Sequence, residues 1–114
     1  MANPDRIGKD SVRAVDLNVG EWIDRGAARL QELSAYGKRL RLVEFLPGFS
    51  DPNWCVKGHV VYVLEGTLDS EYEDGLSTRR AGEAYIIPWG VKHRSRNLYD
   101  RPARLFIVDD ERGD

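Results

Sequence analysis

One stretch of the chain, residues 58–66 (Gly-His-Val-Val-Tyr-Val-Leu-Glu-Gly), limits the possible folds more than any other. Its core is short, β-branched and bounded by glycines, which favours a strand over a helix. Side chains alternate along a strand, so His59 shares one face with Val61 and Val63. The opposite face is also apolar, and consists of Val60, Tyr62 and Leu64. We therefore expect both faces to be covered, with one imidazole inside a barrel or sandwich.

Short strand patterns separated by glycine and proline fill most of the remaining chain. Asp74-Gly75 is a strong hairpin signal, and Pro47-Gly48 and Pro88-Trp89-Gly90 are typical of turns. Many short strands at regular spacing indicate an all-β barrel or sandwich. Besides the run described above, the expected strands are residues 12–17, 39–46, 68–73, 76–81, 84–87, 92–98 and 103–108.

The length and composition predict a single globular domain. The chain has 114 residues, 41% of them hydrophobic and 32% charged, which is enough for one core without disulfides or metal staples. We expect residues 1–11 to form a flexible arm, residues 12–109 the barrel, and residues 110–114 a charged tail. No repeat or linker divides the sequence.

The same composition excludes several function classes. A net charge of −2, from 17 basic and 19 acidic residues that are well mixed, does not fit a nucleic-acid binder. No stretch approaches the roughly 20 apolar residues that a membrane span needs, and the first residues lack the pattern of a signal peptide. The single cysteine, Cys55, cannot form an internal disulfide, so we expect a cytoplasmic protein.

The chain resembles the cupin family over residues 38–109. The second cupin motif is present with unchanged spacing, as Gly82, Pro88, Gly90, His93 and Asn97. The first motif ends in a segment similar to residues 62–66, and Pro47-Gly48 is similar to the Pro-Gly that precedes that motif. The resemblance implies an all-β jelly-roll barrel, also called a double-stranded β-helix.

The first motif departs from the family pattern at the metal ligands. In metal-binding cupins it supplies two histidines and a glutamate, which join the second-motif histidine around one ion. Here the histidine positions fall at Pro52 and Trp54, and the glutamate position falls at His59. With a register shift in the loop, Cys55 would fall at one of these ligand positions. Of the family ligands, only His93 matches residue by residue, so the usual metal site is degenerate.

His59 and His93 are the strongest candidates for a functional site. In the expected strand 92–98, the arginines at 94 and 96 form the natural solvent face, so His93 points inward. Two neutral imidazoles suit Zn²⁺, Fe²⁺ or Ni²⁺, although a catalytic zinc site normally has three protein ligands. The alternative is a pair of interior histidines hydrogen-bonded to each other, to Tyr85 or to water.

Three further residues are candidates for ligand binding. Cys55 is a third metal ligand or a reactive thiol, or else a small buried apolar side chain. Trp54 and Trp89 adjoin motif residues in loops that should flank the barrel mouth, where aromatic walls suit a small-molecule site. The alternative for each tryptophan is packing in the core or at an interface.

Residues 21–35 allow two interpretations. The apolar residues in this stretch fall near helical spacing, although Gly26 weakens a helix by roughly 1 kcal/mol. The resemblance instead favours a strand over residues 28–35, because many small cupins begin with extra strands that pair with a second subunit. The apolar outer face at residues 60–64, with Trp22 and Ile23, further predicts a homodimer.

The function predicted from these residues is the binding of a small molecule or metal by His59 and His93 inside the barrel. One alternative is a metal-dependent cupin enzyme of the isomerase or dioxygenase type, and another is a non-catalytic sensor or partner-binding module. Fold alone does not decide among them. The sequence names no substrate and leaves open whether the protein is an enzyme.

Overall fold

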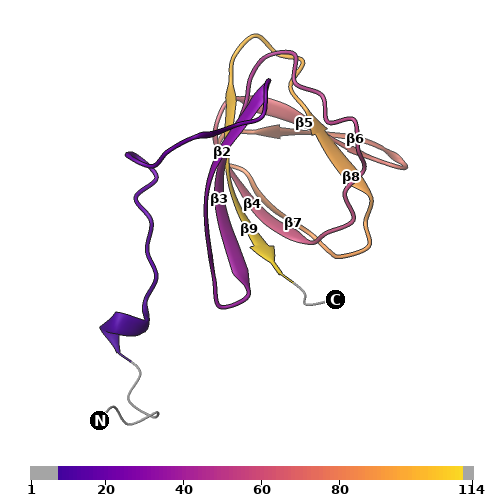
Figure 1. Ribbon diagram of the computed structural model, residues 1–114. Coiled ribbons are helices and arrows are strands. Elements are labelled where there is room, and N and C mark those ends of the chain that lie inside the picture. Colours follow the sequence, from indigo (N-terminus) through magenta and orange to yellow (C-terminus); the bar gives the residue numbers. More distant parts are fainter. Residues whose placement is uncertain (1–7, 112–114) are drawn as a thin grey trace.

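The computed structural model describes residues 8–111, which form an all-β fold with one short 3₁₀ turn, η1 (Lys9–Ser11), and no α-helix among them (Figure 1). This part of the chain has no helix long and apolar enough to cross a membrane. Most of the expected arm and tail, residues 1–7 and 112–114, lies outside the described residues. The strands are β1 (Ile23–Asp24), β2 (Ala28–Ala35), β3 (Lys38–Phe45), β4 (His59–Glu65), β5 (Thr67–Tyr72), β6 (Gly75–Arg80), β7 (Ala84–Ile87), β8 (His93–Arg96) and β9 (Ala103–Asp110).

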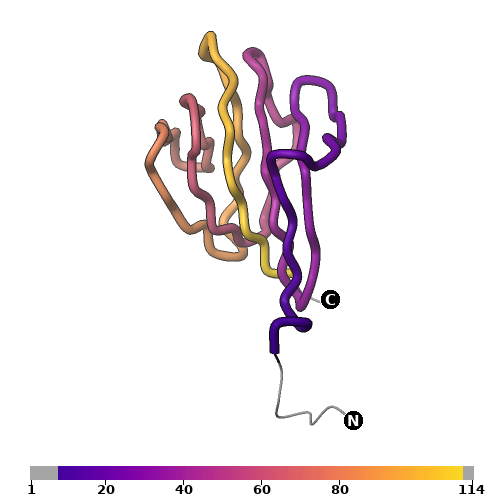
Figure 2. Tube along the Cα trace, turned by 90° about the vertical axis from the view of Figure 1, so that its left-hand side faces the viewer, coloured from indigo at the N-terminus to yellow at the C-terminus, as the bar shows by residue number. Residues whose placement is uncertain are grey.

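The strands form two antiparallel sheets that enclose a barrel. The larger sheet has the order β1-β2-β3-β9-β4-β7, and the smaller has the order β6-β5-β8. The last strand, β9, therefore lies between β3 and β4, which are adjacent to it in space but far from it in sequence. Figure 1 shows the smaller sheet opposite the larger one, and Figure 2 shows β9, in yellow, running the length of the larger sheet. This arrangement confirms the expected jelly-roll barrel.

The apolar core fills one part of the barrel interior. Val43, Leu105 and Val63 are partners across β3, β9 and β4, and all three are buried. Leu68 of the smaller sheet packs in the same cluster and is also fully buried. Val61 and Val63 therefore lie in the core between the two sheets, on the inward face that strand alternation predicted for them.

Residues 21–35 contain the strands β1 and β2 and no helix, so the strand expected at residues 28–35 is confirmed. Gly26 adopts a positive φ of 77° in the turn before β2, and β2 pairs with β3 along its whole length, from Ala28–Phe45 to Ala35–Lys38. This long antiparallel pairing overrides the helical spacing of the apolar residues, which is a weak signal when tertiary partners are available.

The prediction of a strand at residues 12–17 is wrong. This segment has no strand partner among residues 8–111, and Figure 1 shows it lying outside both sheets. An isolated extended segment cannot form a ladder, because each strand hydrogen bond needs a neighbouring backbone. Tyr36 holds the start of the segment by donating a hydrogen bond to the carbonyl of Ser11.

The outer face of the larger sheet is apolar and exposed. Val60 of β4 lies in register with Ile86 of β7 and with Val108 of β9, and Val108 in turn faces Leu40 of β3. Ile86 is 75% exposed and Val60 is 48% exposed. The expectation that both faces of residues 59–64 are covered is therefore wrong within one chain, since only the inward face is covered by the smaller sheet.

Candidate functional site

The inner face of the larger sheet changes from apolar to polar toward one end of the barrel. Beyond the core row, Ile107 and Val61 lie in register with Arg41 and Tyr85. The following row joins four strands, in the order Arg39, Asp109, His59 and Ile87. Strand pairing thus brings a histidine, a carboxylate and two arginines to the end of an apolar interior. They line a cavity of about 260 Å³.

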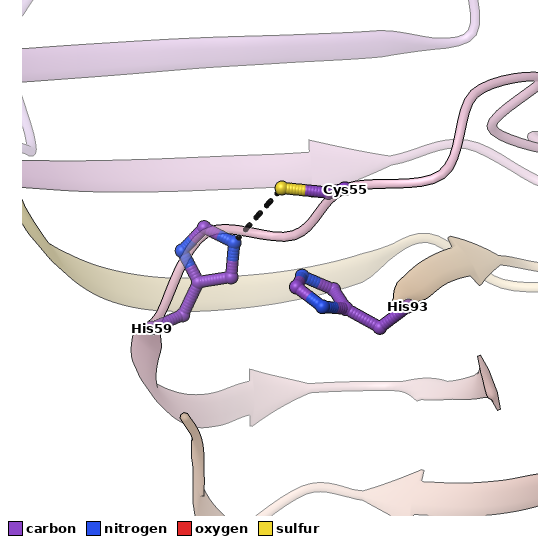
Figure 3. Close-up of side chains that lie close together, drawn as sticks. All are labelled: Cys55, His59 and His93. Carbon is purple, nitrogen blue, oxygen red and sulfur yellow. Dashed lines mark hydrogen bonds between the residues drawn. The ribbon is translucent and has the colours of Figure 1, made fainter. Parts of the chain in front are cut away.

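His59 and His93 enter this cavity from opposite sheets. His59 begins β4 and His93 begins β8. Their ring centroids are 4.9 Å apart and the ring planes are nearly perpendicular, at 89° (Figure 3). The geometry agrees with the inward orientation that strand alternation predicted for both residues.

The loop before β4 brings Cys55 to the two histidines. Cys55 and His93 form an isolated β-bridge, in which Cys55 N–H donates to the His93 carbonyl at 2.8 Å and His93 N–H donates to the Cys55 carbonyl at 2.9 Å. This bridge fixes the loop backbone beside β8. The Cys55 Sγ lies 3.5 Å from the His59 Nε2 (Figure 3).

Hydrogen bonds set the tautomers of both imidazoles. His59 Nδ1 contacts the carboxylate of Asp109, and His93 Nδ1 lies 2.8 Å from the carbonyl of Val91. Both partners are acceptors, so Nδ1 carries a proton in each ring, and the neutral form of either ring has its lone pair at Nε2. The Nε2 of His93 is buried and has no hydrogen-bond partner among the described residues. Burial lowers the pKa of His93, which favours the neutral imidazole that a ligand atom requires.

Asp109 orients His59, and sequence reasoning missed it. The residue is 5% exposed. Burial raises the pKa of the Asp109 carboxyl, but the hydrogen bond with His59, together with the charge and hydrogen bonding of Arg41, outweighs burial and lowers it overall. The Arg41 Nε lies 2.8 Å from Asp109 Oδ2. The prediction ended the last strand at Val108, whereas the inward alternation through Leu105 and Ile107 reaches Asp109 and was the available signal.

The remaining predicted site residues divide between the cavity and the surface. Tyr85 lines the cavity, and burial raises the pKa of its phenol above the usual value. Trp54 is 39% exposed, does not line the cavity, and lies 4.2 Å beneath the guanidinium of Arg94. Trp89 packs against the backbone at Gly58, where an added Cβ would meet its ring at 2.6 Å. Neither tryptophan therefore lines the cavity, whereas charged side chains do.

The three convergent side chains form a donor set that suits a transition metal. The ligand atoms of Cys55, His59 and His93 lie within 4.8 Å of one another. Two imidazole nitrogens and one sulfur match the preferences of Zn²⁺, Fe²⁺ or Ni²⁺. Asp109 behind His59 supplies the carboxylate partner that metal-ligating histidines usually have. The unpartnered Nε2 of His93 is consistent with a ligand atom.

The sequence model of the cupin domain matches residues 41–109, well over half of the chain. The chain belongs to the cupin family. Among curated proteins it is similar to the oxalate oxidase GF-3.8 of Triticum aestivum, with 28% identity over 102 residues. The match covers 81% of this chain but only 42% of the wheat protein, so this cupin spans less than half of that relative.

Solved structures agree on the fold. The polyketide cyclase RemF from Streptomyces resistomycificus matches with a TM-score of 0.77 and 24% identity, covering 90% of this cupin and 82% of the cyclase. A sugar phosphate isomerase of the cupin superfamily from Silicibacter pomeroyi matches with a TM-score of 0.72 and 20% identity, covering 88% of this chain and 76% of the isomerase. At these identities the likeness extends to the barrel architecture alone.

Proposed function

We propose that this cupin binds a small molecule inside its barrel, beside a divalent transition-metal ion held by Cys55, His59 and His93. One observation carries the proposal, namely the convergence of three ligand atoms within 4.8 Å in a cavity. The His93 Nε2 is buried without a partner among the described residues, and leaving such an atom unsatisfied costs about 1–3 kcal/mol. A bound ion removes that cost.

Three protein ligands leave a coordination position for an exogenous molecule, as in catalytic zinc sites. A metal in such a site acts as a Lewis acid that polarises a ligand oxygen. The protein residues have separate roles. His59 is held by Asp109, the Cys55 backbone is fixed by its bridge to His93, and apolar side chains on the inner strand faces exclude water from one side of the cavity.

Catalysis of the isomerase or dioxygenase type is a second candidate function. The row of Arg39, Asp109 and His59 favours it, because charged groups next to a coordination position can stabilise charge that develops during a reaction. The wheat oxidase, the cyclase and the isomerase, to which this chain is similar, all carry the names of enzymes. A sensor or partner-binding role requires the same ligand site without turnover.

The test is the metal content of protein purified without a histidine tag. We expect about one equivalent of metal after loading with Zn²⁺, Fe²⁺ or Ni²⁺, the iron loading being anaerobic, followed by desalting. His59→Ala and His93→Ala should lose the metal while retaining a cooperative unfolding transition. Ser95→Ala is the matched control, since Ser95 lines the cavity but lies outside the donor set. Wild-type protein that holds no metal after all three loadings, or a double histidine variant with full metal content, would contradict the proposal.

We also propose that two copies associate through the exposed outer face of the larger sheet. Val60, Ile86 and Val108 form a continuous apolar row there, and twofold dimers are the commonest assemblies. Ile86→Lys should shift the protein from dimer to monomer in sedimentation velocity. The matched control is Leu76→Lys, because Leu76 is a similarly exposed side chain on the smaller sheet. A wild-type monomer at high micromolar concentration would refute the dimer.

The proposal also includes the kind of partner and the cellular compartment. The balanced charge favours small-molecule over nucleic-acid partners. Cys55 is a free thiol, which fits a reducing compartment such as the cytoplasm.

A further inference from the structure

The cavity carries more positive than negative side chains. Among the described residues that line it, four are cationic and two are carboxylates. The cations are Arg39, Arg41, Lys57 and Arg94, and the carboxylates are Asp51 and Asp109. Cations in a partly enclosed, low-dielectric site attract anions more strongly than they do on an open surface.

The existing ion pairs show which donors stay available. Arg39 donates to Glu32 and Arg94 donates to Glu71, so carboxylates outside the cavity lining hold these two side chains. Arg41 binds Asp109 through its Nε and Nη2 edge. This leaves the Nη1 group of Arg41 without a partner among residues 8–111.

Lys57 is the second available cation. Its ammonium group has no ion pair within the described residues. The two carboxylates of the lining accept hydrogen bonds from within the protein, although Asp51 accepts only one among the described residues. Asp109 accepts from His59 and Arg41, and Asp51 accepts the backbone N–H of Asn53. The charged side chains of the lining therefore remain positive on balance, with Lys57 unpaired among the described residues.

The opposite part of the cavity is apolar. Phe45, Val61, Leu105 and Ile107 line it, and all four belong to the hydrophobic core. The volume of about 260 Å³ lies just below the usual range for drug-sized ligands. A compact molecule with one apolar part and one anionic part matches this distribution.

We propose that the ligand is a small organic acid whose carboxylate lies against Arg41 and Lys57 and whose apolar part contacts the core side chains. This inference rests on the proposed function, because it uses the same cavity. It adds the chemical class of the ligand, and it assigns specificity to two residues outside the metal donor set. Carboxylates pair with guanidinium and ammonium groups through charge-assisted hydrogen bonds, which are about twice as strong as neutral ones.

The test compares three probes of nearly the same shape, namely benzoate, benzamide and benzylamine. Their affinities are measured by calorimetry on metal-loaded and metal-free protein at low ionic strength. We expect benzoate to bind at least tenfold more tightly than benzamide, benzylamine to bind most weakly, and the benzoate affinity to fall with added salt. Equal affinities for benzoate and benzamide would overturn the proposal, as would no binding of benzoate up to 10 mM, which is about 10⁴-fold above a micromolar Kd.

Two variants test the assigned residues. Lys57→Gln and Arg41→Gln should each weaken benzoate binding about tenfold, and Lys57→Gln should leave benzamide binding unchanged. Lys92→Gln is the matched control, because Lys92 is an exposed lysine that does not line the cavity. If both charge-removing variants bind benzoate as wild type does, the proposal is wrong.

Metal content on the same samples separates the two proposals. Protein that takes up no metal after the three loadings and still discriminates benzoate from benzamide supports the organic acid and contradicts the metal site. Metal-loaded protein that binds both probes equally does the reverse.

Discussion

Replacing Asp109 with asparagine tests how the site is held together. The asparagine Oδ1 can still accept the Nδ1 proton of His59, but the side chain no longer carries a charge for Arg41. The change therefore keeps the shape and one hydrogen bond while removing the ion pair. We expect a loss of both folding stability and metal affinity, because Asp109 is 5% exposed and bridges the two side chains.

The stability loss follows from the contacts. A hydrogen bond to a charged group contributes about 1.5–3 kcal/mol, and removing one partner of a buried ion pair costs about 3–5 kcal/mol. The range of about 1.5–3 kcal/mol applies here, since the Arg41 side chain is 18% exposed and retains some hydration. We expect a loss of about 2–3 kcal/mol, or about 8–12 °C in Tm for a domain of this size. Metal affinity should fall about 10- to 100-fold, as for other carboxylates behind ligating histidines.

Urea unfolding of the metal-free protein and zinc competition against a chelator measure the two effects separately. Asp110→Asn is the matched control, because the Asp110 side chain is 61% exposed and, among the described residues, forms an ion pair only with Lys38. Surface pairs of this kind contribute about 0–1 kcal/mol. If Asp109→Asn unfolds like the control, the packing argument is refuted. If stability falls while zinc affinity does not, Asp109 is structural and does not position His59 for a metal.

Three further changes test the fold. Burial raises the pKa of Glu44, but hydrogen bonds from Arg29 and Arg104 lower it overall. The stability that the ionised carboxylate contributes is therefore complete above pH 4.5, and it is lost as the pH falls through the lowered pKa. Glu44→Gln should have a lower free energy of unfolding at pH 7 than the wild type. Urea unfolding at several pH values should also show that this free energy falls less steeply in the variant as the pH is lowered. Gly66→Ala should lower the Tm more than Gly82→Ala, because both glycines have positive φ but only at Gly66 would a Cβ collide with backbone. Asn97→Ala should lower the free energy of unfolding in urea by about 3 kcal/mol, because the buried amide group of Asn97 donates hydrogen bonds to two backbone carbonyls.

The sequence by itself determined the fold class and the two histidines. Alternation in residues 59–64 separates an inward from an outward face, and glycine and proline mark the turns between short strands. The spacing from Gly82 to Asn97 then identified the family resemblance. These signals are local, because strand period and turn chemistry depend on neighbouring residues. His59 and His93 accordingly face one cavity, as predicted.

Only the tertiary structure decided the rest of the site. Arg41, His59 and Asp109 come together because β9 inserts between β3 and β4, and no local pattern encodes that register. The position of Cys55 depends on its bridge to His93, formed by a loop with no periodicity of its own. The strand at residues 28–35 was favoured by the family resemblance and not by the local spacing of apolar residues, and it forms by pairing with β3. Pairing between distant segments is a property of the whole barrel, since its free energy comes from hydrogen bonds and burial that exist only after the chain has closed on itself.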